Sequence, residues 1–244
     1  MKKVLVMAVV LTAVFAGLVF AAKPVANLSK ITGGITVDGK LDDWKALGIE
    51  PVVINKAEQV AIGKPYWIGA EKQSGKVYVA FTDKEILICA DITNPKGAAN
   101  KYNDGDIYQG TGIELFVGFD NTDVEREMYL ETDYQIGIST GQYVKDTGKF
   151  KVKPSAFIYN IKKPATGAVV KCKPTKTGYI LEASIPASLL PGYDATDGLE
   201  IGFDIGIDDV GAKGMLRTVQ LTWTGDKDGW QNPKGWGKAI IKAK

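Results

Sequence analysis

The chain of 244 residues contains no histidine and only two cysteines, Cys89 and Cys172. Without histidine, the Ser-His-Asp and Cys-His arrangements of nucleophilic catalysis are excluded, and so is a zinc site built on imidazole. The two cysteines leave a choice open. They could pair in an exported protein, or Cys89, which lies in the apolar run EILICADI, could be a buried free thiol.

The chain also lacks an excess of charge of either sign, since its formal net charge is only +2.

At the N-terminus, Lys2 and Lys3 precede an apolar run that extends to Ala22, and no basic stop-transfer cluster follows it. This pattern is typical of a secretory signal peptide, and we predict residues 1–21 as a leader that is cut after Ala21. A retained membrane anchor is the alternative, because the run is close to the length that a bilayer requires.

Export would place the protein outside the cell, in the periplasm or on the cell surface, with membrane contact only through an uncut leader. Removal of Lys2 and Lys3 would leave equal numbers of basic and acidic side chains. A neutral protein has no overall field that attracts nucleic acid, so we expect no nucleic-acid partner.

Apolar and polar residues alternate along several stretches, which is typical of half-buried strands. The clearest are LEIGFDIGIDD (199–209), GIELFVGF (112–119) and GYILEASIP (178–186). Further strands are predicted at Ile35–Asp38, Val77–Thr82, Ile86–Ile92, Arg126–Thr132, Gln135–Thr140, Ala156–Ile161, Val169–Lys173, Arg217–Trp223 and Lys238–Lys242.

Helical pattern is scarce, with one weak candidate in LDDWKAL (41–47). The segment from Lys45 to Gly75 has the weakest pattern and predicts one or two edge strands with a loop. Many short strands and almost no helix indicate an all-β protein, an antiparallel β-sandwich of the jelly-roll or immunoglobulin-like kind. We expect one domain, residues 27–244, after the signal peptide.

Three of the five tryptophans fall within TWTGDKDGWQNPKGWGK (222–238). Trp223 and Trp236 adjoin predicted strands, and Trp44 follows LDD, so these three are expected to pack in the interior. Trp230 has only loop-forming neighbours, which favours a functional role.

Four segments in order resemble the family 9 carbohydrate-binding modules, sugar-binding β-sandwiches associated with xylanases within the DOMON-like superfamily. They are ITVDGKLDDWKAL (35–47), KVYVAFTDKEILICADITNP (76–95), YQGTGIELFVGFDN (108–121), and the strands at 178–190 and 199–209 taken with LTWTGDKDGWQNPKGWGK (221–238). Together they span nearly the whole chain beyond the leader. The resemblance implies a non-catalytic β-sandwich that clamps a sugar between two aromatic rings.

By this resemblance, Tyr108 and Trp230 are the clamp, and Glu114 hydrogen-bonds sugar hydroxyls, although Glu114 could instead be a buried acid held by the protein. Gln231 and Asn232, beside Trp230, are further candidates. Tyr129 and Glu131 align where family members carry an arginine and an asparagine, with Arg126 nearby. An aromatic ring covers the C–H face of a pyranose at a gain of about 1–3 kcal/mol.

Modules of this kind can hold structural calcium, and two acidic pairs could supply oxygen ligands. These are Asp104 with Asp106 and Asp120 with Asp123. No spacing matches an EF-hand loop. No other cofactor is expected.

The function expected is therefore an exported carbohydrate-binding protein for plant-type polysaccharide or oligosaccharide of the xylan or cellulose class, supporting its breakdown or uptake. A glycosidase is an alternative without a distinctive carboxylate pair. A structural or cell-surface sandwich without sugar affinity is another. A haem-binding redox module would require Met128 or Met215, since no histidine exists.

Overall fold

The computed structural model describes residues 23–210 and 216–244. Within these residues, fourteen strands join into one curled sheet, and β8 and β9 form a separate two-stranded ribbon. The strands are β1 (Val25–Lys30), β2 (Val52–Ile54), β3 (Val60–Ile62), β4 (Ser74–Phe81), β5 (Glu85–Thr93), β6 (Gly112–Gly118), β7 (Asp133–Ser139), β8 (Gln142–Val144), β9 (Lys149–Val152), β10 (Ser155–Ile158), β11 (Lys163–Pro164), β12 (Val169–Pro174), β13 (Gly178–Pro186), β14 (Glu200–Asp209), β15 (Val219–Thr222) and β16 (Gly237–Ala243).

Helical structure in the described residues is brief. It comprises α1 (Asp42–Ala46) and the 3-10 turns η1 (Ala57–Gln59), η2 (Lys64–Tyr66), η3 (Asp104–Gln109), η4 (Ala187–Leu189) and η5 (Pro233–Gly235).

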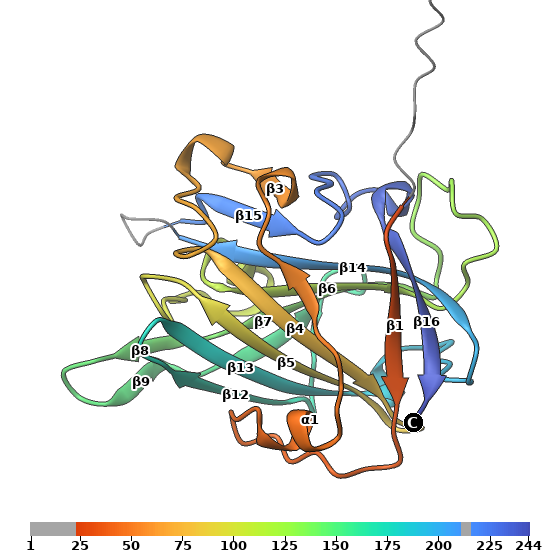
Figure 1. Ribbon diagram of the computed structural model, residues 1–244, viewed down its shortest axis with the longest axis horizontal. Helices are drawn as coiled ribbons and strands as arrows, with labels where there is room; N and C mark the ends of the chain where they lie inside the picture. The colour runs from red at the N-terminus through yellow and green to blue at the C-terminus, as the bar shows by residue number, and fades with distance from the viewer. Residues whose placement is uncertain (1–22, 211–215) are drawn as a thin grey trace, which may run out of the picture.

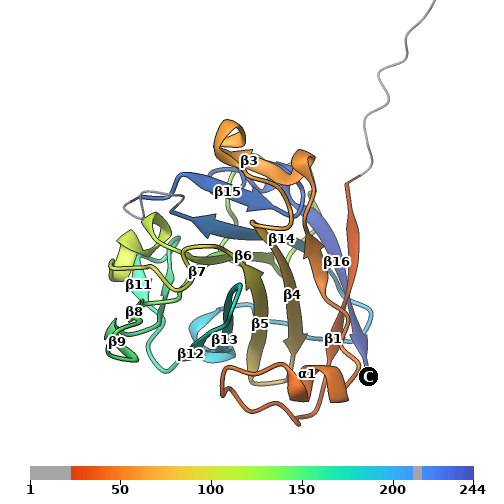
Figure 2. The same cartoon turned by 60° about the vertical axis from the view of Figure 1, so that its left-hand side comes forward.

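The sheet curls into two layers that face each other. One layer has the order β11-β10-β7-β6-β14-β16, and the other has the order β1-β4-β5-β13-β12. Figure 1 shows the second layer crossing in front of the first, and Figure 2 shows β1 beside β16, where the layers are joined. β1 runs parallel to both β16 and β4, whereas all other paired strands are antiparallel.

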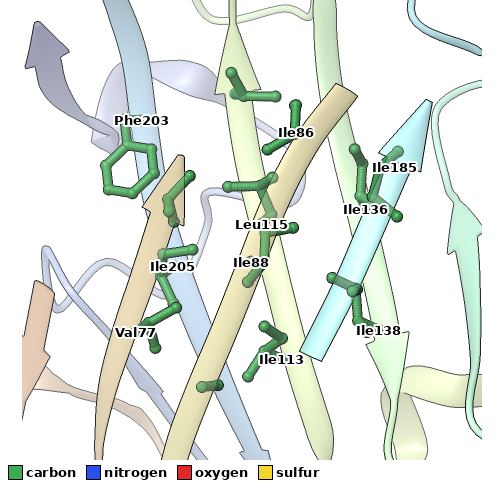
Figure 3. Close-up of a cluster of buried hydrophobic side chains, with 14 of the residues drawn as sticks. Val77, Ile86, Ile88, Ile113, Leu115, Ile136, Ile138, Ile185, Phe203 and Ile205 are labelled. Carbon is green, nitrogen blue, oxygen red and sulfur yellow. The ribbon is translucent and has the colours of Figure 1, made fainter. Parts of the chain in front are cut away.

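The main core fills the space between the layers with branched aliphatic side chains. Figure 3 shows Val77, Ile86 and Ile88 from one layer facing Leu115 and Ile205 from the other. All five are at most 2 % exposed, and burial of each such side chain contributes about 1.5–3 kcal/mol. Because every second residue of a strand points inward, the intervening residues of β6, β7 and β14 point to the opposite face.

A smaller core covers the outer face of the layer that contains β4 and β5. Trp44 on α1 is fully buried there against Tyr78, and its indole N–H donates to Glu182 on β13 at 2.8 Å. Glu182 also accepts from the backbone N–H groups of Asp38 and Gly39. The expected interior position of Trp44 is confirmed.

The fold class is confirmed as a single β-sandwich, and most of the alternating stretches are strands as predicted. Two predicted strands are wrong. Ile35–Asp38 is an irregular segment whose backbone is held by Glu182 and Asp43. Arg126–Thr132 is a loop, because the Arg126 side chain turns back to pair with Asp133 at the start of β7. β1 begins at Val25, slightly before the expected domain start at residue 27.

The predicted signal peptide, residues 1–21, lies outside the described residues, and its cleavage stays a prediction. Across residues 23–210 and 216–244, no helix is both long enough and apolar enough to cross a membrane.

The two cysteines are free thiols. Cys89 on β5 lies opposite Glu182 of β13, whereas Cys172 on β12 lies opposite Leu181. Leu181 and Glu182 are consecutive in one strand and point to opposite faces, so the two thiols lie on opposite faces of this layer. The sequence allows either a disulfide or free thiols, and this geometry favours free thiols.

Candidate functional site

A cavity of about 630 Å³ lies over the outer face of the β7-β6-β14-β15 region. Its size is in the range of small-molecule sites, about 300–1,000 Å³. The outward residues of the strands form its floor, and loops form its walls. The lining residues are Ile62, Gly105, Tyr108, Glu114, Phe116, Tyr129, Gln135, Tyr159, Asn160, Asp204, Arg217, Gln220, Thr222, Asp226, Lys227, Gly229 and Trp230.

The floor is a network of buried polar side chains centred on Glu114 of β6, which is only 2 % exposed. Glu114 accepts hydrogen bonds from the amides of Gln135 at 3.1 Å and Gln220 at 3.3 Å. Arg217 lies 3.5 Å from Glu114 and 3.0 Å from Asp208. Gln220 also donates to Asp208. These contacts join strands β6, β7, β14 and β15 beneath the cavity.

Burial and the neighbouring charges have opposite effects on the pKa values of the ionisable groups in this floor. Burial raises the pKa of the Glu114 and Asp208 carboxyl groups, while the neighbouring Arg217 acts in the opposite direction. Burial alone would lower the pKa of Arg217, but the two carboxylates raise it, so the guanidinium remains charged. The floor thus presents a mixture of acceptors and donors that suits a neutral, hydroxyl-rich ligand.

Two exposed aromatic side chains stand in the walls. Tyr108, on η3, is 38 % exposed, and Trp230, in the loop between β15 and β16, is 53 % exposed. The guanidinium of Arg217 lies over the Tyr108 ring at 5.2 Å from its centroid, and Tyr159 meets the same ring edge-on at 6.4 Å. Tyr108 is thereby oriented by two neighbours, while its exposed surface stays available to a ligand.

The Tyr159 ring packs close to Gly137 of β7, where the strand has no side chain. A methyl group at Gly137 would lie 2.8 Å from the Tyr159 hydroxyl oxygen, closer than real contacts allow. The glycine therefore lets this third aromatic ring of the cavity lining approach the backbone of the strand closely.

The predicted ligand residues divide into two groups. Tyr108, Glu114, Tyr129 and Trp230 all line the cavity, which brings together segments distant in sequence. The Tyr129 hydroxyl, however, donates to the carbonyl of Gly229. Their contact with a ligand stays a prediction.

The remaining three candidates do not line the cavity. Glu131 is exposed, and its backbone carbonyl accepts from Tyr134. Gln231 is exposed, and the Asn232 side chain caps η5 by accepting from the backbone N–H of Lys234. Contact of these three residues with a ligand stays a prediction.

The predicted calcium ligands lie in turns and loops, and calcium binding stays a prediction. Asp106 accepts from Gln109, Asp120 from Thr122, and Asp123 from the backbone of Glu125. Asp104 is exposed at the start of η3 with φ of 49°. Among residues 23–210 and 216–244, no three acidic, cysteine or histidine side chains gather as a metal site. Of the two methionines proposed for haem, Met128 is 77 % exposed, and Met215 lies outside the described residues.

Sequence reasoning missed most of the floor. Asp204 and Asp208 occupy the outward face of β14 as the alternation predicts, but outward polar residues on a sandwich are ordinarily solvated. Only the loops that fold over this face turn it into a buried surface. Arg217 and Gln220 have no signal of their own beyond their place within the predicted strand Arg217–Trp223.

Comparison with known proteins decides the family. Residues 38–244 match the model of the family described as carbohydrate family 9 binding domain-like. The chain belongs to this family. The match covers most of the chain and includes every residue that lines the cavity. It confirms the resemblance that the four sequence segments indicate.

Solved structures of family 9 modules share the fold. A carbohydrate-binding module of family 9 from Caldicellulosiruptor kristjanssonii, in complex with cellotriose, superposes with a TM-score of 0.64 and 16% sequence identity. The superposition covers 91% of this chain and 95% of that one. A structure described as the same type of module from that organism, in complex with glucose, gives a TM-score of 0.62 at 17% identity, covering 89% and 96% of the two chains.

This chain spans less than a fifth of the length of the curated relatives that it matches. Exoglucanase XynX of Acetivibrio thermocellus is 27% identical over 231 residues, and endo-1,4-beta-xylanase A of Thermoanaerobacterium saccharolyticum is 27% identical over 233 residues. Each match covers 93% of this chain but only 18% or 17% of the enzyme. Because the matched family is one of carbohydrate-binding domains, this family 9 domain is a non-catalytic binding module, as the resemblance implies.

Proposed function

We propose that this family 9 module is exported and binds the glucose or xylose units of a plant polysaccharide, or of oligosaccharides released from it. The sugar occupies the cavity, with a ring face against Tyr108 and Trp230 and hydroxyls directed to the polar floor. The observation that carries this proposal is the presence of two exposed aromatic side chains in one cavity over a buried polar network.

The chemistry of a pyranose fits this arrangement. Its C–H face gains from burial against an aromatic ring, at about 1–3 kcal/mol for each ring. Its rim of hydroxyls needs partners once water is removed, because an unsatisfied buried polar group costs about 1–3 kcal/mol. Glu114 supplies carboxylate acceptors, and Arg217 supplies guanidinium N–H donors beyond the Nη1 group that pairs with Glu114 and Asp208. An acceptor and a donor close together suit a hydroxyl that both donates and accepts.

The comparisons support the ligand class. A family 9 structure neighbour is a complex with cellotriose and another is a complex with glucose, and the curated relatives are an exoglucanase and a xylanase. We infer that this module similarly brings a polysaccharide-degrading enzyme, or the cell surface, to its polysaccharide.

Calorimetric titration of the protein with glucose, cellotriose and xylotriose, and affinity electrophoresis in xylan and in soluble cellulose derivatives, test the proposal. We expect saturable binding to at least one oligosaccharide, with and without added calcium. Absence of binding to every one of them would favour a structural sandwich without sugar affinity. Release of reducing sugar from the same polysaccharides would instead indicate an enzyme.

Export is tested separately by the N-terminus of the protein recovered from its native host. We expect it to begin at Ala22. A protein recovered with Met1 in place and associated with the membrane would support a retained anchor instead.

A further inference from the structure

The carbonyl oxygen of Gly229, immediately before Trp230, accepts two side-chain hydrogen bonds. The Tyr129 hydroxyl and the Trp236 indole N–H each donate to it at 2.9 Å. A backbone carbonyl has two lone pairs, so both are used. The position of the peptide that carries Trp230 is therefore set by two aromatic side chains from different parts of the chain.

These two side chains also support each other. The Tyr129 and Trp236 rings meet edge to face with centroids 5.3 Å apart. Trp236 is only 2 % exposed and lies against Phe116 of β6 at 5.8 Å. The pair is thus fixed to the sheet beneath, whereas Trp230 itself projects into solvent.

The loop that carries Tyr129 has its own anchor. Arg126 forms a bidentate pair with Asp133, with donor–acceptor distances of 3.0 and 2.7 Å, and Asp133 is fully buried at the start of β7. Planar two-bond pairs of this kind combine strength with defined geometry. Asp133 also accepts from the backbone N–H of Leu130, which fixes the chain next to Tyr129.

The first part of the Trp230 loop is held from below. Asp204 on β14 is 1 % exposed and accepts from the backbone N–H of Thr224 at 3.2 Å and from the Thr224 hydroxyl. The Thr222 hydroxyl donates to the carbonyl of Asp226 at 3.0 Å. The loop is consequently attached near its start and again at Gly229, directly before the exposed indole.

We propose that Tyr129 and Trp236 are positioning residues that hold the backbone of Trp230 at the mouth of the cavity before a sugar arrives. This inference rests on the proposed function and assigns to Tyr129 a role other than ligand contact. A ring that is already in place loses less conformational freedom on binding, and the saving increases affinity. If the loop were mobile, the free energy of sugar binding would also have to order it, and the affinity would be lower.

Tyr129→Phe tests the inference, because it removes the hydroxyl and keeps the ring against Trp236. A hydrogen bond of this type has a net value of about 0.5–1.5 kcal/mol, so we expect binding of cellotriose to weaken about three- to tenfold. Tyr143→Phe is the matched control, since Tyr143 lies on β8, outside the cavity lining. We expect the control to bind as the unmodified protein does.

Trp230 fluorescence supplies a readout that is independent of sugar. The signal of Trp230 is isolated as the difference between each protein and the same protein carrying Trp230→Phe. Without ligand, we expect Tyr129→Phe to increase acrylamide quenching and decrease the anisotropy of this signal. A second variant, Gly229→Ala, would place a methyl group 3.1 Å from the Trp236 indole nitrogen and is expected to act in the same direction.

The outcomes are distinguishable. Unchanged Trp230 quenching and anisotropy in Tyr129→Phe and in Gly229→Ala, in folded proteins of normal circular dichroism, overturn the inference. Weaker sugar binding with unchanged Trp230 mobility also overturns it, since the Tyr129 hydroxyl would then act on the sugar directly. If the unmodified protein binds no sugar, the proposed function fails, while the fluorescence comparison still decides the positioning role.

Discussion

The guanidinium group of Arg217 lies over the ring of Tyr108, with 5.2 Å between the guanidinium carbon and the ring centroid. The same guanidinium pairs with Asp208 at 3.0 Å and with Glu114 at 3.5 Å. One side chain therefore links the buried floor of the cavity to an aromatic residue of its wall. A change at Arg217 should affect both stability and binding.

Arg217→Ala removes the only cation paired with Glu114 and Asp208 among the described residues. Loss of one partner of a buried pair costs about 3–5 kcal/mol. Because burial already raises the pKa of both carboxyl groups, these acids protonate at low pH and the cost falls. We expect urea unfolding to show a decrease of about 3 kcal/mol at pH 8 and a smaller one at pH 5.

Lys234→Ala is the control for Arg217→Ala, because Lys234 forms exposed ion pairs with Glu125 and Glu127. Exposed pairs contribute about 0–1 kcal/mol. Equal losses in the two variants, or a loss in Arg217→Ala that does not depend on pH, would contradict the assigned role of the buried pair.

The buried carboxyl group of Asp204 should make the stability of the protein depend on pH below about pH 7. Burial raises the pKa of Asp204 to about 7, although hydrogen bonds from Thr224 and Ile205 act in the opposite direction. A folded-state pKa above the unfolded one means that the folded protein binds more protons. The contribution of Asp204 to stability is thus complete below about pH 4 and is lost as the pH rises through about 7.

Asp204→Asn isolates this contribution. The difference in unfolding free energy between the unmodified protein and Asp204→Asn should fall by on the order of 4 kcal/mol between about pH 4 and pH 7 and then level off. Urea unfolding across this pH range provides the measurement. A difference that rises with pH would mean that Asp204 is stabilised as a carboxylate, against the stated sign.

The thiols of Cys89 and Cys172 should not form an intramolecular disulfide, because they lie on opposite faces of one layer. Burial raises the pKa of both thiols, which leaves little reactive thiolate in the folded state. A thiol reagent should titrate two groups in denaturant and react slowly with the native protein. Detection of fewer than two groups in freshly unfolded monomer, without reductant, would contradict this geometry.

Sequence periodicity predicts the strands well where one face is buried. The alternation in GYILEASIP predicts a strand at 178–186, and β13 has those bounds. β1 could not be predicted, because VANLSK lacks alternation and its main partner, β16, lies at the other end of the chain. Propensity misleads at Arg126–Thr132, where a buried ion pair with Asp133 overrides the strand pattern.

The candidate site could be predicted in part. Trp230 is identifiable because a large aromatic residue stands among loop formers, and Tyr108 and Glu114 come from the family resemblance. Arg217 and Gln220 could not be identified, because their burial depends on loops folding over the sheet from elsewhere in the chain. Tyr129 has a predicted role as a ligand contact, yet its hydroxyl points to Gly229, a pairing across 100 residues that no local pattern reveals.

The central claim is that Tyr108 and Trp230 hold a sugar between them, and calorimetric titration of cellotriose into Tyr108→Ala and Trp230→Ala tests it most directly. Tyr66→Ala serves as the control, because Tyr66 is 64 % exposed but does not line the cavity. Since each ring contributes about 1–3 kcal/mol, we predict at least about a fivefold loss of affinity for each site variant and none for the control. Affinity equal to that of the unmodified protein in either site variant would contradict the clamp.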